Sequence, residues 1–396
     1  MDLKYSVSTR LLSLDVFRGI TIVAMILVNN PGEWDNRFAA LKHAQWNGLT
    51  PTDLIYPFFM FIMGISMCFS YTKFNFKFSK QLLIKIVRRA TFLFLIGVLL
   101  GWLGLFLKGF NELKNENIDF VSRLIYAITD FENIRILGVL QRLAIVSLIG
   151  SVIVLLVKPN RLPWIIGIIL LSYWLIMAFS VSYAQDDNNL ATIIDREILG
   201  ATHLHFDRLQ DGTLYIFEPE GLLSTIPCIA HVLLGFLFGK ILLESKEINQ
   251  AVQKILILGT ILLFIGFLLD YSFPINKKLW SSSYVLVSCG LGALFLGLLI
   301  WIIDIREHKK WINFFESFGI NPLFMYTFAG VLSTLLVKIY FKSDGHWISL
   351  KSFIVNNFIN LFADGNWGSL IYAVLYVILN WVIADILYRR KILIKL

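Results

Sequence analysis

Residues 282–303 read SSYVLVSCGLGALFLGLLIWII, and none of them carries a charge at neutral pH. A helix of about 20 such residues is long enough to cross the roughly 30 Å hydrocarbon core of a bilayer. Similar apolar runs precede and follow it, at residues 14–30, 51–71, 90–107, 136–157, 163–183, 222–243, 253–271, 317–340 and 369–388. The sequence therefore predicts an all-α, polytopic integral membrane protein with about ten transmembrane helices and no strands.

The composition supports this fold class and excludes others. Of the 396 residues, 57% are hydrophobic and only 16% are charged, and the mean hydropathy is +0.72, whereas soluble domains have about 25% charged residues. The net charge of +8 is not gathered on one basic face, so we expect the lipid bilayer and not nucleic acid as a partner. Cys68, Cys228 and Cys289 lack the spacing of a disulfide framework or a zinc site, so no metal is expected.

The distribution of charges predicts the orientation in the membrane. Lys and Arg concentrate in the N-terminal tail, in the even-numbered connections and in the tail after residue 388, whereas most Asp and Glu lie in the odd-numbered connections. Positive residues favour the cytoplasmic side, so both termini are expected there. Residues 30–50, 108–135 and 184–221 then form long outer connections. We interpret residues 1–396 as a single transmembrane domain.

Two arginines lie inside predicted spans, where an unpaired Arg costs about 2.5–3.5 kcal/mol. Arg18 is near the cytoplasmic end of the first span, beside Asp15, and its side chain either reaches the interface or binds phosphate. Arg142 lies about 10 Å below Arg135 at 1.5 Å per residue. It needs a partner, for which Asp53, Glu316 or a charged ligand are candidates, and Gln141 beside it adds an amide.

His43 lies just before the second span, on the predicted outer side. A lone histidine at a membrane boundary is usually structural, but Asn29 and Asp53 are close to it in the chain. A histidine titrates near neutral pH and can accept a proton from an attacking amine, and a carboxamide can polarise a carbonyl as part of an oxyanion hole. His203 and His205 form an HxH pair without an evident third metal ligand, so we interpret them as loop residues.

Further motifs are spread along the chain: RLLSLDVFRG at 10–19, VN at 28–29, HAQWNGLT at 43–50 followed by Asp53, PF at 57–58, FIMG at 61–64, RILGVLQR at 135–142, IDR at 194–196, EPEG at 218–221, PINKKLW at 274–280 and GINP at 319–322. Together they resemble the membrane domain of heparan-alpha-glucosaminide N-acetyltransferases and their bacterial relatives. The resemblance covers essentially the whole chain. From this resemblance we expect the chain to lack the extra lumenal domain and first helix of the lysosomal enzyme.

The resemblance implies a transmembrane acyltransferase in a bacterial inner (cytoplasmic) membrane. Such an enzyme takes acetyl-CoA as co-substrate from the cytoplasm and passes the acetyl group to an amino sugar on the outer side, without a metal. It implies catalytic roles for His43, as base or acetyl relay, with Asn29 and Asp53. The residues expected to contact acetyl-CoA, in a cavity between the first, second, fourth and eighth spans, are Arg18, Arg88, Arg89, Gln141, Arg142, Lys278 and Asn321.

Other functions remain compatible with the sequence. Buried polar residues would also suit a secondary transporter of a sugar or an anion, although no internal repeat is evident. An O-acetyltransferase of a cell-envelope polysaccharide would keep the acetyl-CoA site and change only the acceptor, and a scaffold subunit would need no chemistry. The sequence determines neither the acceptor sugar nor the oligomeric state, and a homodimer stays one alternative.

Overall fold

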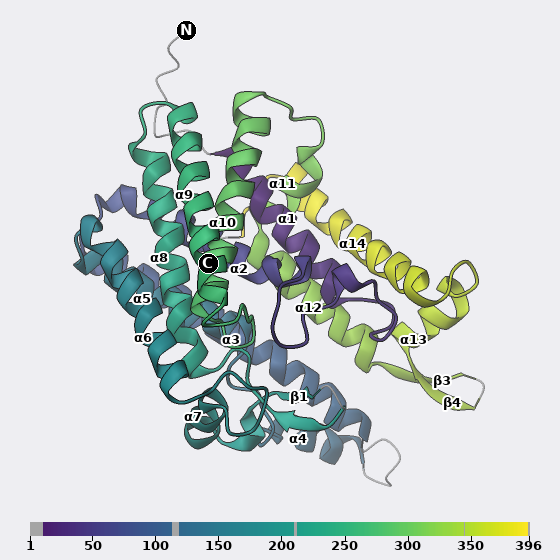
Figure 1. Ribbon diagram of the computed structural model, residues 1–396. Coiled ribbons are helices and arrows are strands. Elements are labelled where there is room, and N and C mark those ends of the chain that lie inside the picture. The colour runs from purple at the N-terminus through teal and green to yellow at the C-terminus, as the bar shows by residue number, and fades with distance from the viewer. Residues whose placement is uncertain (1–10, 113–118, 210–211, 344, 395–396) are drawn as a thin grey trace.

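The computed structural model describes residues 11–112, 119–209, 212–343 and 345–394, and these are mostly helical (Figure 1). The helices are α1 (Leu12–Asn29), α2 (Ile55–Tyr71), α3 (Lys80–Glu112), α4 (Phe120–Thr129), α5 (Val139–Leu156), α6 (Leu162–Phe179), α7 (Leu190–Leu199), α8 (Leu222–Glu244), α9 (Ile248–Asp270), α10 (Ser282–Leu299), α11 (Ile312–Ile320), α12 (Pro322–Lys338), α13 (Leu350–Ile354) and α14 (Gly365–Arg389). Residues Pro51–Leu54 form a short 3₁₀ turn before α2, and a π-helical turn, Ile300–Ile305, extends α10.

The predicted fold class is confirmed. In the described part of the chain nine helices are long and apolar enough to cross a membrane, and α11 with α12 makes a tenth span if the bent pair is counted as one. The two helices meet at 87°. Pro322 causes the break, because a proline at the first position of α12 disfavours helical geometry in Asn321 before it. The predicted cytoplasmic termini, residues 1–10 and 395–396, lie outside the described residues.

The third span begins ten residues earlier than its apolar run. Residues 80–89 were expected in a basic connection, but they form the first turns of α3, so Arg88 and Arg89 lie within the helix. Leu82, Leu83, Ile86 and Val87 recur at helical spacing in this segment. Long basic side chains tolerate such a position because their charged ends can reach water. Charge therefore marks the membrane boundary here and does not mark the end of the helix.

Two short hairpins were not predicted. Strands β1 (Phe206–Arg208) and β2 (Leu214–Ile216) pair within the long connection between α6 and α8, and β3 (Tyr340–Ser343) pairs with β4 (His346–Ser349) after α12. The expectation of no strands is wrong for these connections. Strands of three or four residues leave no alternating pattern long enough to recognise in the sequence.

Close helix crossings bring polar side chains together in the bundle. A Cβ on Gly19 of α1 would lie 1.8 Å from the carbonyl oxygen of Phe315 in α11, so only glycine permits this approach. At the same crossing Arg18 donates a 3.3 Å hydrogen bond to the Gly319 carbonyl.

The connections that carry chemistry lie at one end of the bundle. Figure 1 shows α7, β1 and the β3–β4 hairpin at this end, and the α8–α9 and α10–α11 connections at the other. The segment 42–50 packs against residues 275–280, since Gly48 donates to the Ile275 carbonyl (2.8 Å) and Asn276 donates to Asn47 (3.1 Å). These contacts join parts of the chain more than 200 residues apart.

Candidate active site

A cavity of about 690 Å³ lies among these connections, within the size range of small-molecule sites. We call it the His43 cavity. Arg142 of α5 lines it, and the rest of the lining comes from the connections: Asp53, Gln185 and residues in the stretches 34–46, 205–209, 219–220 and 277–280. The cavity was expected between the first, second, fourth and eighth spans; instead, the connections contribute most of its wall.

Asp53 holds His43 in place. The two side chains approach to 2.7 Å between His43 Nδ1 and Asp53 Oδ1, and Asp53 is fully buried. Its other oxygen accepts hydrogen bonds from the backbone N–H groups of Ala44 (3.0 Å) and Thr50 (3.1 Å). One carboxylate therefore folds the loop 44–50 around itself and orients the imidazole. The predicted proximity of His43 and Asp53 is present in the structure.

Lys277 completes this group and was missed by the sequence reasoning. Its Nζ lies 3.0 Å from His43 Nδ1 and 3.4 Å from Asp53 Oδ1. If His43 carries its proton on Nδ1, the imidazole donates this proton to Asp53 Oδ1, and the Lys277 ammonium faces the same oxygen. This tautomer leaves His43 Nε2 unprotonated, and no described residue bonds it. Burial lowers the pKa of Lys277, and Asp53 and Glu220 oppose that shift.

Lys278, the neighbouring lysine, also lines the cavity. It forms an ion pair with Asp207 of β1 and lies over the ring of Trp46, with Nζ 5.9 Å from the ring centroid. Trp46 in turn donates from its indole nitrogen to the Tyr183 carbonyl (2.7 Å). These contacts place Lys278 at the cavity wall, with its charge already balanced by a carboxylate.

Arg142 is completely buried and lines the same cavity. The prediction that Asp53 or Glu316 pairs with Arg142 is wrong. The Nη2 group instead donates to the carbonyls of Pro219 (2.5 Å) and Gly221 (3.3 Å) and to the Ser224 hydroxyl, while Glu316 accepts from Tyr388 (3.0 Å). Backbone carbonyls can hold a guanidinium without leaving any charge signature in the sequence, which explains the error.

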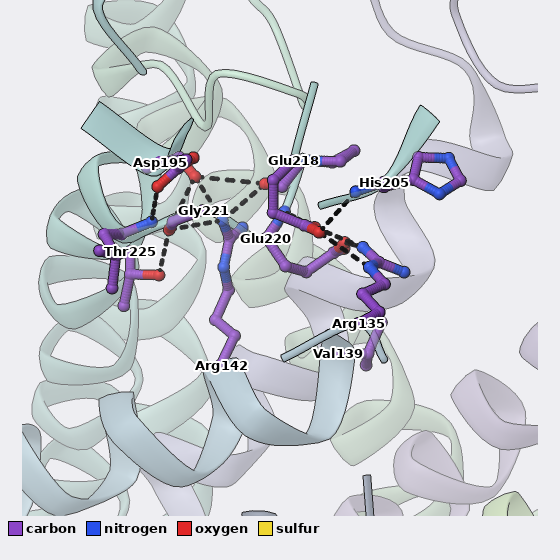
Figure 2. Close-up of polar contacts among 12 residues, drawn as sticks. Arg135, Val139, Arg142, Asp195, His205, Glu218, Glu220, Gly221 and Thr225 are labelled. Atoms are coloured by element: carbon purple, nitrogen blue, oxygen red, sulfur yellow. Dashed lines mark hydrogen bonds and ion pairs between the residues drawn. The ribbon is translucent and has the colours of Figure 1, made fainter. Parts of the chain in front are cut away.

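Arg135 organises the motif 218–221 from the other side (Figure 2). Its guanidinium binds Glu218 through Nε (2.8 Å) and also Nη2, which in addition reaches Glu220 (2.6 Å). The backbone N–H of His205 donates to Glu218 as well (3.2 Å). The Arg135 charge lowers the pKa of Glu220 against the effect of its burial. We call Arg135, Glu218 and Glu220 the Arg135 cluster.

Asp195 of α7 supports the end of this motif. Its Oδ1 accepts a hydrogen bond from the Leu222 backbone (2.8 Å), and Oδ2 is buried without a partner. A Cβ on Gly221 would lie 1.8 Å from that oxygen, so the close approach requires glycine. Burial raises the pKa of Asp195 to about 7. The IDR and EPEG motifs are thus in contact through Asp195 and Gly221.

Three predicted residues do not line the His43 cavity. Asn29 lines a separate pocket of about 310 Å³ together with residues of α3 and α12. Gln141 packs against Gly97 of α3, where an added Cβ would lie 2.3 Å from its side-chain oxygen. Asn321 donates to the Ile392 carbonyl and accepts from the Ile394 N–H, both at 2.8 Å. The structure therefore does not bring these amides to His43.

The remaining predicted arginines also lie away from the cavity. Arg18 donates to Asp15 (2.9 Å) and to Ser66 of α2 (2.8 Å). It lies eleven residues before Asn29 in α1, which is about 16 Å along the helix at 1.5 Å per residue. Arg89 lies near enough to Arg18 for their charges to repel. Arg88 is exposed, with its guanidinium 5.6 Å from the centre of the Phe92 ring.

The HxH pair has structural contacts. His203 Nδ1 lies 2.8 Å from the Ile134 carbonyl, and the Ile136 N–H donates to the His203 carbonyl (3.3 Å). His205 lines the His43 cavity, where burial and Arg135 lower its pKa. The described residues contain no cluster of three His, Cys, Asp or Glu side chains suited to a metal ion.

The fold and the site define a polytopic membrane protein with a histidine–aspartate pair in a cavity at one end of the helical bundle. Residues 10–273 match the family described as heparan-alpha-glucosaminide N-acetyltransferase, catalytic. The chain belongs to this family of membrane acetyltransferase domains, which confirms the resemblance seen in the sequence.

Two curated relatives are similar along most of the chain. The human heparan-alpha-glucosaminide N-acetyltransferase is 28% identical over 444 residues, covering 98% of this chain and 60% of the human protein. The mouse protein of the same name is 28% identical over 388 residues, covering 84% of this chain and 55% of its own length. The chain therefore spans about 60% of the length of the human relative.

Proposed function

We propose that the protein transfers the acetyl group of cytoplasmic acetyl-CoA to the amino group of a glucosamine-type sugar at the outer face of the membrane. The observation that carries the proposal is the His43–Asp53 pair, 2.7 Å apart, at the wall of a cavity large enough for a sugar. The family supports the reaction class, and the relatives' name supports an amino-sugar acceptor.

His43 acts as the general base in this proposal. Its Nε2 accepts a proton as the amine nitrogen attacks the thioester carbonyl, so that a C–N bond forms. The C–S bond then breaks, and the imidazolium returns its proton to the leaving thiolate. Asp53 fixes the tautomer and balances the imidazolium charge, a contribution that general-base catalysis needs. In a relay variant Nε2 itself takes the acetyl group first.

The arginine pair Arg18 and Arg89 supports a site for the nucleotide end of acetyl-CoA. The charges of these two residues are close enough to act on each other, and guanidinium groups bind phosphate bidentately. The predicted orientation puts this pair nearer the cytoplasm and His43 nearer the outside. A pantetheine arm is long enough, at roughly half the membrane thickness, to connect the two positions.

The test is acetyl transfer from radiolabelled acetyl-CoA to glucosamine by the purified chain in lipid nanodiscs. We expect an alkali-stable acetamide product, its loss in His43→Ala and retained acetyl-CoA binding in that variant. An alkali-labile product would indicate an O-acetyltransferase. Sugar transport into vesicles without acetyl-CoA, together with no acetylated product, would contradict the proposal in favour of a transporter.

A further inference from the structure

The His43 cavity has hydrogen-bond donors that no protein atom satisfies. Among its described lining residues, the buried polar side-chain atoms without a partner are Nε and Nη1 of Arg142 and Nε1 of Trp280. All three are N–H groups, and the two side chains are in contact, with the guanidinium carbon 5.3 Å from the Trp280 ring centre. We call these residues the Arg142–Trp280 corner. Buried donors of this kind need an acceptor atom, which a bound water or a ligand can supply.

The charge of Arg142 selects the kind of acceptor. Arg142 forms no ion pair with any described carboxylate, its hydrogen bonds to oxygen run from Nη2 to neutral groups, and its side chain also contacts the Cys228 thiol. The nearby Glu218 and Glu220 are bonded to Arg135 instead (Figure 2). Their charges act on Arg142 through space, but the N–H groups of a buried cation that lack a direct acceptor are costly. An oxygen that carries or develops negative charge would compensate it.

The corner is tied to the catalytic base through one turn of chain. The backbone N–H of Trp280 donates to the Lys277 carbonyl (3.1 Å), and the Lys277 ammonium lies 3.0 Å from His43 Nδ1. Trp280 has a φ of +54°, a left-handed conformation that is strained for a bulky residue. Its ring is 99% buried and packs edge-on against Tyr56 and Tyr284, both with ring centres 5.1 Å away. The packing holds this strained position, as at pre-organised sites.

We propose that the Arg142–Trp280 corner binds the carbonyl oxygen of the acetyl group and stabilises the oxyanion that forms during transfer. This inference rests on the proposed function and adds the residues that bind the acetyl carbonyl oxygen. When the amine attacks the carbonyl carbon, the C=O electron pair moves onto oxygen and meets the free N–H groups. The C=O bond re-forms as the C–S bond breaks. Hydrogen-bond donors aimed at a developing oxyanion act mainly on kcat.

Trp280→Phe is the sharpest variant because it removes the N–H group and retains a large aromatic ring. We expect kcat to fall about tenfold, and Arg142→Gln to lower it by about 10²- to 10³-fold, with the KM for acetyl-CoA within about twofold in both. Trp381→Phe in α14 is the matched control, because it also removes a buried indole N–H without a partner but does not line the cavity. Its kcat should stay at the wild-type value.

A spectroscopic measurement keeps the test independent of turnover and of any folding defect in Arg142→Gln. In the isotope-edited infrared spectrum of bound [1-¹³C]acetyl-CoA, hydrogen bonds should lower the thioester carbonyl frequency in the wild type. We expect a smaller shift in Trp280→Phe and the full shift in Trp381→Phe.

Unchanged kcat and carbonyl frequency in Trp280→Phe would overturn the inference while wild-type turnover leaves the proposed function intact. A raised KM with unchanged kcat would also overturn it, because the corner would then bind a permanent anionic group of a substrate. A wild-type chain that neither binds acetyl-CoA nor transfers acetyl would refute the proposed function, and this inference with it.

Discussion

Two arginines seven residues apart serve different purposes. Arg135 binds two carboxylates directly, whereas Arg142 bonds neutral oxygens with one nitrogen, and its other nitrogens are buried without a partner (Figure 2). The comparison teaches that a direct bond to carboxylates distinguishes a structural cation from one that can bind a substrate. In our proposal the Arg135 cluster shapes the wall, and His43 with the Arg142–Trp280 corner performs the chemistry.

The largest expected effect concerns the His43 cavity. His43→Ala should lower kcat for acetyl transfer by about 10²- to 10⁴-fold, because the base is removed. Since His43 is partly exposed and its contacts are few, thermal unfolding in detergent should stay close to wild type. Near-wild-type turnover would refute the catalytic role and make Asp53 the next candidate.

A substitution in the Arg135 cluster should change the stability of the fold. Arg135→Ala leaves Glu218 and Glu220 buried without their ion-pair partner, so we expect a destabilisation of about 3 kcal/mol. Arg135→Lys is the matched control, which keeps the charge but loses the two-pronged contact with Glu218. A variant that unfolds like the wild type yet loses kcat would contradict the division between the two regions.

A smaller effect is expected from Asp195, which supports the motif between the two arginines. Because its pKa rises to about 7 in the fold, an unfolded chain ionises this carboxyl at lower pH than the folded one. Its contribution to stability therefore falls as pH rises from about 4 to about 7, and is constant above that. Asp195→Asn should remove this loss and raise Tm by about 2–4 °C at pH 8. A Tm difference independent of pH would refute the assignment.

The smallest effect is expected from Lys277→Met. The Lys277 ammonium lies 3.0 Å from His43 Nδ1 and 3.4 Å from Asp53 Oδ1, so its loss weakens the group that orients the imidazole. We expect a fall in kcat that is smaller than in His43→Ala, with an unchanged KM for acetyl-CoA. Lys278→Met is the comparison, because that lysine pairs with Asp207, and its kcat should stay at the wild-type value. Equal losses of kcat in both variants would show that the effect is general electrostatics.

The sequence predicts those features that are local along the chain. Ten spans follow from apolar runs, and the His43–Asp53 pair follows from two residues ten positions apart on either side of a helix start. Lys277 and Trp280 lie more than 200 residues from His43 and meet it only through packing of the connections. No local pattern records such a contact.

Two other differences have physical reasons of their own. Asn29 is near His43 in sequence, but the end of α1 directs it into a pocket shared with α3 and α12. Asn321 looked available for a ligand, but its amide binds the segment after α14. A polar residue in an apolar segment predicts that it has a partner, but tertiary packing determines which group that partner is.

The most direct test of the account is the structure of the wild-type chain with acetyl-CoA, solved by cryo-electron microscopy in nanodiscs without an acceptor. The account predicts the acetyl group in the His43 cavity, with its carbonyl oxygen within hydrogen-bond reach of Arg142 or Trp280 and its carbon facing the space beside His43 Nε2. An acetyl group bound elsewhere, for example in the pocket of Asn29, with the His43 cavity free of ligand, would contradict it.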